Sequence, residues 1–207
     1  LGTLAALYLG EFAPHKVREV CKPALEMLSG VPSVVYGYFA LLLVTPVLAL
    51  IIPGLSGFNM LSAGLVIGVS IVPFVSSMSE DAMRAVPMDI REGSYAMGAT
   101  RLQTAWHVVF PAALSGIVAA YILAMSVALG QTMIVAIAAG QQANLTLDPT
   151  QPAATLTAYI AQVSIGDVAH GTIEYQSIFA VGLVLLLMTL VLNILGHYLR
   201  RRYREAY

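Results

Sequence analysis

The segment EGSYAMGATRLQTAWHVVFP, residues 92–111, is a polar interruption in the middle of an apolar chain. It carries Glu92 and Arg101 together with two glycines, and long apolar runs lie on both sides of it. Asp89 can cap a helix, and Glu92 three residues later completes a capping-box pattern. The pattern predicts a short helical segment over residues 89–104 that joins two apolar stretches.

Gly98 lies inside this predicted helix. A glycine in a helix interior is less favourable than alanine by about 1 kcal/mol, and close approach of another backbone is the usual reason to keep it. A short helix with small residues on one face fits a groove on a partner protein. The alternative is an ordinary amphipathic surface helix that only connects two membrane spans.

Composition and charge distribution set the class of the protein. The chain has 207 residues, of which 58% are hydrophobic and 10% charged, and its mean hydropathy is +0.82. A soluble domain carries about a quarter of charged residues, so we expect an integral membrane protein that forms a single domain over residues 1–207. The basic residues fall in three groups: Lys16, Arg18 and Lys22; Arg84, Arg91 and Arg101; and Arg200, Arg201, Arg202 and Arg204.

Five apolar stretches are candidate spans, judged against the requirement of about 20 residues. They are residues 1–10, 24–52, 60–79, 108–139 and 175–199. The first is too short to span, so we expect the chain to start part-way through a helix, with a further helix missing upstream. Pro32, Pro46 and Pro73 predict bent helices that pack in a bundle, where neighbours satisfy the freed carbonyls.

The three basic groups also orient the chain, because cytoplasmic segments of membrane proteins are enriched in Lys and Arg. The groups at 16–22, 84–101 and 200–204 are therefore expected inside. The loop at residues 141–174 contains no Lys or Arg and is expected outside. Apolar residues at near-helical spacing within residues 154–166 predict a short surface helix in this loop.

Residues 92–111 resemble the EAA signature of type I ABC importer permeases, which reads E-A-A-x3-G-x9-I-x-L-P. The matching positions, with mild departures and intact spacing, are Glu92, Gly93, Ser94, Gly98, Val108, Phe110 and Pro111. The resemblance implies an all-α, polytopic transmembrane helix bundle with a cytoplasmic coupling helix, which docks into a cleft of the ATP-hydrolysing subunit. It implies ATPase-subunit contacts at Glu92, Gly93, Ser94, Gly98, Ala99 and Arg101.

Three further stretches are similar to the phosphate-specific permease subunits: SGVPSVVYGYF at 29–39, residues 98–117 and ALGQTMIVAIAAG at 128–140. This resemblance implies import of inorganic phosphate across the plasma (inner) membrane of a prokaryote. It also implies four kinds of partner: a second permease subunit, two ATP-binding subunits, an extracytoplasmic substrate-binding protein and membrane lipid, but no nucleic acid. Import of another oxyanion or of a phosphonate is the alternative within this class.

One departure concerns the substrate. The phosphate subunits typically read G-R-A-L-G-E-T-M, whereas this chain has Val127 in place of the Arg and Gln131 in place of the Glu. If the Arg and Glu form an ion pair, losing both is easier than losing one, because no charge is left unpaired. An anion path without the Arg must rely on neutral donors or on the partner permease.

Four polar residues are candidates for the translocation path. Gln131 and Thr132 are the most polar pair of their span, and they either bond a neighbouring helix or line the path. Ser33 and Tyr36 flank the Pro32 bend and have the same two interpretations.

Several chemistries have no matching residues in the sequence. There is no G-x4-G-K-[ST] motif, so we expect no catalytic residue and no bound cofactor in this chain, with ATP and Mg²⁺ used by the partner subunit. No spaced Cys/His set predicts a metal site. The alternative from a different class is a secondary carrier or channel that works alone, which needs a charged relay inside the spans or paired broken helices. A membrane enzyme is a further alternative, and it needs a set of catalytic residues.

Overall fold

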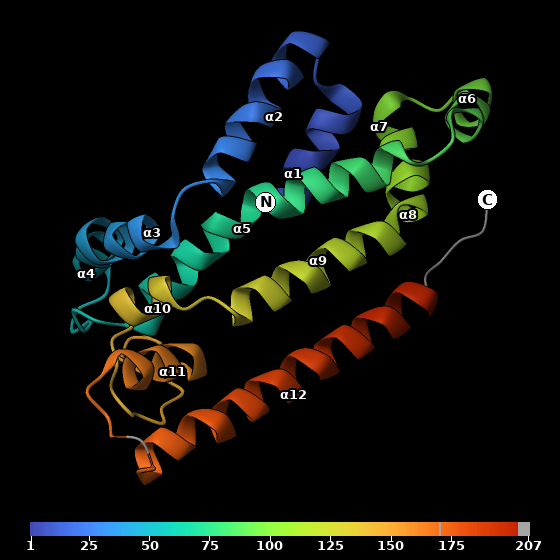
Figure 1. Ribbon diagram of the computed structural model, residues 1–207. Coiled ribbons are helices and arrows are strands. Elements are labelled where there is room, and N and C mark those ends of the chain that lie inside the picture. The colour runs from blue at the N-terminus through green and yellow to red at the C-terminus, as the bar shows by residue number, and fades with distance from the viewer. Residues whose placement is uncertain (170, 203–207) are drawn as a thin grey trace. The chain divides into compact units, whose positions relative to one another are not determined.

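The computed structural model describes residues 1–169 and 171–202, without the side chains of 200–202, and these residues form helices and no strand (Figure 1). The first elements are α1 (Gly2–Leu7), the π-helical η1 (Tyr8–Phe12), α2 (His15–Ser29), α3 (Ser33–Phe39), the π-helical η2 (Ala40–Val44), α4 (Thr45–Ile51) and α5 (Met60–Arg84). There follow α6 (Met88–Ala96), α7 (Arg101–Thr104), the π-helical η3 (Ala105–Val109), α8 (Phe110–Ala112), α9 (Leu114–Leu129), α10 (Met133–Ala138), α11 (Leu156–Ile165) and α12 (Ile173–Arg202).

The chain forms two compact units, each built from separate stretches of sequence. The first unit comprises Leu1–Gly30, Ile71–Ser126 and the residues from Leu192 onward. The second unit comprises Val31–Ser70 and Val127–Val191. The units therefore cut across the order of the sequence, and α5, α9 and α12 contribute residues to both.

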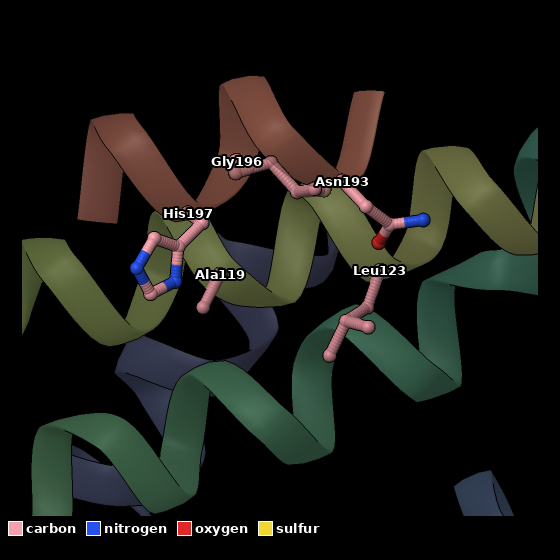
Figure 2. A pocket seen from close by; sticks show the side chains of 6 residues that line it. Ala119, Leu123, Asn193, Gly196 and His197 are labelled. Atoms are coloured by element: carbon pink, nitrogen blue, oxygen red, sulfur yellow. The ribbon is translucent and has the colours of Figure 1, made fainter. Parts of the chain in front are cut away.

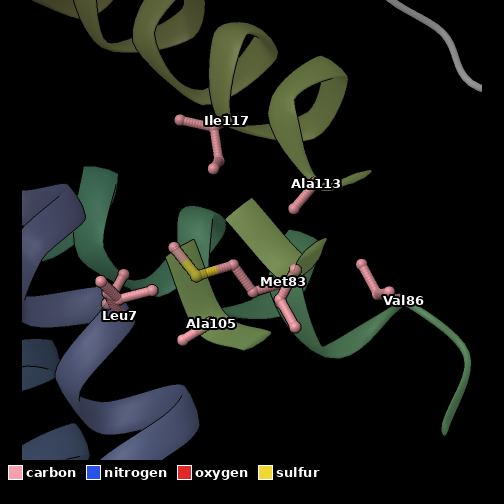
Figure 3. Packing of buried hydrophobic residues seen from close by; sticks show 8 residues of the cluster. Leu7, Met83, Val86, Ala105, Ala113 and Ile117 are labelled. Carbon is pink, nitrogen blue, oxygen red and sulfur yellow. The ribbon is translucent and has the colours of Figure 1, made fainter. Parts of the chain in front are cut away.

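The core of the first unit lies where α1, the end of α5 and the elements after α7 meet. Met83 is fully buried, and Figure 3 shows it near the centre of the cluster, with Leu7 on one side and Val86 on the other. The cluster consists of Ala6, Leu7, Met83, Val86, Ala105, Val109, Ala113 and Ile117. Burial of each large apolar side chain contributes about 1.5–3 kcal/mol, so this cluster fixes the base from which α6 projects.

The second unit packs α3 and η2 against α10 and the first turns of α5. Its buried cluster consists of Ala40, Ala63, Val66, Ile134, Val135, Ala138 and Ala139. Beside it lies a neutral polar network, in which Asn59 Oδ1 accepts hydrogen bonds from Ser62 N at 2.8 Å and Ser62 Oγ at 2.9 Å. The Thr45 hydroxyl donates to Ala40 O at 3.0 Å. Polar groups buried in this unit are thus satisfied without any charge.

Three of the described helices are long and apolar enough to cross a membrane: Ser33–Ile51, Met60–Arg84 and Ile173–Leu199. Arg101–Ala112 and Leu114–Leu129 meet the same test together, but they are bent by 66° at their junction. These helices match four of the predicted spans, and α11 confirms the short helix predicted within residues 154–166.

The bounds of two predicted spans are wrong. The stretch at 24–52 is not one helix, because α2 ends at Ser29 and Pro32 begins a new helix. The stretch at 108–139 ends early at Leu129, and α10 is a separate short helix. The breaks fall at residues 30–32 and 130–132, which are short Gly-containing segments inside longer apolar stretches, so the length of an apolar stretch alone does not mark the end of the helix.

Candidate functional site

The coupling segment, residues 88–104, consists of α6, α7 and the turn between them. No residue of α6 is buried, although the helix follows directly on the buried end of α5. Four large apolar side chains of the segment are exposed: Met88 by 61%, Tyr95 by 38%, Met97 by 88% and Leu102 by 63%. An exposed apolar group of this kind beside charged residues is typical of a protein–protein interface.

Gly98 does not lie in a helix interior, so that prediction is wrong. Helix α6 ends at Ala96, and Gly98 has a φ of +85°. Gly98 N donates to Tyr95 O at 2.9 Å and Ala99 N donates to Ser94 O at 3.2 Å, which is a Schellman motif. The glycine is needed because residues with a side chain are unfavourable in this left-handed conformation.

The predicted cap of the segment is also wrong. Pro87 is the N-cap residue of α6, and Asp89 lies within the first turn, where its charge favours the helix N-terminus. A capping box does occur in the segment, but Thr100 and Gln103 form it at the start of α7. The single predicted helix over 89–104 is therefore two helices joined by a tight turn.

The six predicted contact residues divide into two groups. Glu92, Gly93, Gly98 and Arg101 are exposed. Ser94 is partly buried, because its Oγ lies 2.9 Å from Oγ1 of Thr104 across the turn. Ala99 is also partly buried and closes the Schellman motif. Contact of all six with an ATPase subunit stays a prediction.

Two ion pairs with buried carboxylates lie in the first unit, one of them at the base of this segment, and sequence reasoning missed both. Arg91 Nη1 lies 2.5 Å from Glu11 Oε1, and both side chains are about nine-tenths buried. Arg18 Nη2 lies 2.5 Å from Glu80 Oε1, with Lys22 Nζ 3.9 Å from the other carboxylate oxygen. Glu80 Oε1 has no well-angled hydrogen bond, so this contact is an ion pair rather than a directed bond.

The sequence contains a weak signal for these pairs. The predicted span at 60–79 ended one residue before Glu80, yet α5 continues to Arg84 and Glu80 is 1% exposed. Glu11 likewise follows the first apolar stretch directly. A carboxylate at the very end of an apolar run, in a chain with few basic residues, is the pattern that could have indicated them.

Gln131 lies in the break between α9 and α10 and lines a cavity of about 410 Å³ in the second unit. Its backbone oxygen accepts a hydrogen bond from Thr157 Oγ1 at 2.8 Å. Most of the lining is apolar, from Met60, Ala63, Gly64, Ile67, Ala128, Leu129, Val135, Ala139, Ala154, Leu156, Leu185 and Met188, and the only other polar side chain is that of Thr155. The cavity therefore offers few neutral polar groups and no cation.

The other path candidates are not part of this cavity lining. Ser33 is in the first turn of α3, and Tyr36 packs against the buried cluster of the second unit. Thr132 is the N-cap residue of α10, and its hydroxyl donates to Gly130 O at 3.2 Å. Only Gln131 among the four is brought to a cavity, and a role of any of them in transport stays a prediction.

A second, smaller cavity of about 170 Å³ lies between α9 and the last part of α12 in the first unit (Figure 2). Asn193 and His197 contribute its polar groups, and Ala119 and Leu123 face them. A Cβ at Gly196 would lie 2.4 Å from Ile122 Cγ2, so the two helices approach closely here. Asn193 and His197 therefore lie where α9 and α12 pack closely. Among the described residues, no group of three His, Cys, Asp or Glu side chains is placed to hold a metal ion.

Comparison with known proteins identifies the family. Residues 2–205 match the family described as "Binding-protein-dependent transport system inner membrane component". The chain belongs to this family. It is 37% identical over 202 residues to the "Probable ABC transporter permease protein YqgH" of Bacillus subtilis (strain 168), covering 98% of this chain. It is 30% identical over 211 residues to the "Phosphate transport system permease protein PstC" of Xylella fastidiosa (strain 9a5c), covering 92% of this chain.

The chain spans 65% of the length of the Bacillus protein and 64% of the Xylella protein. Among solved structures, it is similar to a chain of the MetNI methionine ABC transporter in an inward-facing conformation, with a TM-score of 0.76. The sequences are 19% identical, and the match covers 99% of this chain and 86% of the other. This likeness confirms the predicted all-α fold of a type I ABC importer permease.

Proposed function

We propose that this chain is a permease subunit of an ATP-driven importer and that its substrate is inorganic phosphate. Membership of the transport-system family and about 30% identity to PstC proteins support the proposal. The observation that carries it is the coupling segment, whose exposed apolar side chains surround a turn fixed by Gly98. ATP and Mg²⁺ would be bound by a partner subunit, because this chain has no phosphate-binding loop.

The proposed complex contains a second permease, two ATP-binding subunits and an extracytoplasmic binding protein. In it, the coupling segment docks into the ATP-binding subunit through a helix-in-groove contact. Exposed Met and Tyr side chains suit such a groove, because they fill irregular apolar space. Alternating access would follow from movement of this segment.

We place the basic segments in the cytoplasm and residues 141–174 outside. The loop contains no Lys or Arg, and hydrogen bonds from Thr150 N and Oγ1 hold the pKa of Asp148 below its usual value. Leu61 N donates to Pro149 O at 2.8 Å, so the loop is tied to the start of α5. Leu147 is fully exposed, which makes it a better labelling site than the hydrogen-bonded Thr150.

A thiol at Leu147→Cys, with Cys21→Ser, should react with an impermeant reagent in intact cells. Reaction only after lysis would overturn the proposed orientation. The control is Val20→Cys in α2, an exposed site of the basic segment at 16–22 that should react only after lysis.

Import of another oxyanion or of a phosphonate is the second candidate. One observation is against phosphate in particular: Val127 and Gln131 stand where the phosphate subunits typically carry Arg and Glu. The experiment is uptake of labelled phosphate by cells that lack their own phosphate importers and express the full-length permease with its partners. Saturable uptake that unlabelled phosphate inhibits, and a phosphonate does not, supports phosphate. Saturable uptake of a labelled phosphonate or other oxyanion, without saturable uptake of phosphate, would assign the second candidate.

A further inference from the structure

Arg91 is the one charged side chain that anchors the exposed helix α6 to the rest of the first unit. It precedes Glu92 of the signature directly, yet only 11% of its side chain is exposed, whereas Glu92 faces solvent. Its Nη1 pairs with Glu11 at 2.5 Å and its Nη2 donates to Met83 O at 2.8 Å. One guanidinium thus joins three elements: α6, η1 and the last turn of α5.

The partners of Arg91 are themselves rigidly placed. Met83 is fully buried in the core of the first unit, and its carbonyl is among the last of α5, where a cation is favourable. Glu11 lies in η1, a π-helical segment, and such segments are often found at functional sites. Displacement of Arg91 would therefore pull on the first helix and on α5 together.

The contribution of the Arg91–Glu11 pair to the stability of the protein is a weak explanation for its presence. A buried ion pair is often no more stabilising than well-packed apolar residues of the same size, because both charges must be desolvated. What the pair does provide is a fixed geometry, since the planar guanidinium fork holds two acceptors in fixed directions, whereas the donors of a lysine ammonium rotate.

We propose that Arg91 is a positioning residue for energy coupling. In this role it transmits movement of the coupling segment to η1 through Glu11 and to α5 through the Met83 carbonyl. The inference rests on the proposed function, because it assumes that an ATP-binding subunit docks on residues 88–104. The inference assigns a coupling role to Arg91, whose side chain faces away from that docking surface.

The test compares Arg91→Gln, Arg91→Lys and the exchange of Glu11→Arg with Arg91→Glu, in the full-length permease reconstituted with its partner subunits. The quantity measured is phosphate taken up per ATP hydrolysed. We expect Arg91→Gln to bind the ATP-binding subunit normally and to lower this ratio about tenfold, in the range seen for mutations along coupling networks. Arg91→Lys should lower it less, and the exchange should recover part of the loss.

Arg18→Gln is the matched control, because it also breaks a buried ion pair but does not touch the coupling segment. It should reduce the amount of folded complex and leave the ratio unchanged. An unchanged ratio in Arg91→Gln, or an equal fall in Arg18→Gln, would overturn the proposal.

Hydrogen exchange separates failure of this inference from failure of the proposed function. If the parent complex takes up no phosphate, the substrate is wrong, but binding of the ATP-binding subunit should still slow exchange of the amides at residues 2–12 in the parent. Loss of that protection in Arg91→Gln, with the subunit still bound, supports the positioning role. Equal protection in parent and variant contradicts it.

Discussion

The two units keep polar groups inside an apolar protein in different ways. The first unit contains every Lys and Arg of the chain, and it buries Glu11 and Glu80 in ion pairs. The second contains no Lys or Arg, and its buried polar groups form a neutral network around Asn59. The partners of the Arg91–Glu11 pair are 80 residues apart, whereas Asn59 and Ser62 are 3 apart. The buried ion pair ties distant elements together, whereas the bonds between Asn59 and Ser62 complete local structure.

The largest effect should come from breaking the buried pair on α5. Arg18→Leu leaves Glu80, which is 1% exposed, with only Lys22 at 3.9 Å. We expect a loss of about 3–5 kcal/mol in the free energy of unfolding, because a buried charge is left without its main partner. Denaturant unfolding of the purified protein in detergent measures it. The double variant with Glu80→Met should recover most of the loss; a single variant as stable as the parent would show that Glu80 reaches water.

A charge placed in the second unit should have the next largest effect. Gln131→Glu puts an unpaired carboxylate beside an apolar cavity, which costs about 2.5–3.5 kcal/mol at the centre of a membrane helix. We expect less inserted protein and slower substrate uptake at matched expression. Adding Val127→Arg to Gln131→Glu should restore only part of the lost insertion and uptake. The reason is that α9 ends at Leu129, so positions 127 and 131 do not share a regular helix face. If single and double variants behave like the parent, Gln131 is not on the path.

The neutral network should matter less than the ion pair. Asn59→Leu removes the acceptor of Ser62 N and the donor to Ser56 O, so we expect about 1–3 kcal/mol of destabilisation. The matched control is Ser70→Ala, since Ser70 Oγ only bonds Ile67 O within its own helix and should change stability by less than about 0.5 kcal/mol. The stabilities of both variants are compared by thermal unfolding in the same detergent. An Asn59 variant no weaker than the control would mean that water replaces the network.

The smallest change in stability should follow substitution in the coupling segment. Gly98→Ala strains a left-handed position by about 1–2 kcal/mol, although no atom lies within 4 Å of the added Cβ. Local opening of the exposed turn would relieve this strain, so we expect weaker binding of the ATP-binding subunit, measured by titration of that subunit, with almost unchanged global unfolding. Gly182→Ala, in α12 with equally open space and no positive φ, should leave binding of the ATP-binding subunit unchanged. Equal binding by both variants would show that the turn does not shape the docking surface.

Several features could be read from the sequence because they depend on local composition. Apolar stretches long enough to span a membrane predicted four of the helices that the structure contains, and spacing around Glu92 and Gly98 indicated the family. The helix at α11 was predicted from its periodicity. The breaks were predicted poorly, because each is a segment of only a few residues, 30–32 and 130–132, inside a predicted span.

The sequence by itself determined the class of the protein, the approximate spans and the position of the coupling segment. These follow from the free energy of transferring side chains into lipid, which is a sum over nearby residues. Only the tertiary structure decided that Gly98 closes a helix, that Arg91 faces inward to Glu11 while Glu92 faces out, and that Gln131 lines a cavity. The physical reason is that burial and pairing of a charge depend on residues far away in the chain, and no local pattern records which of them will meet.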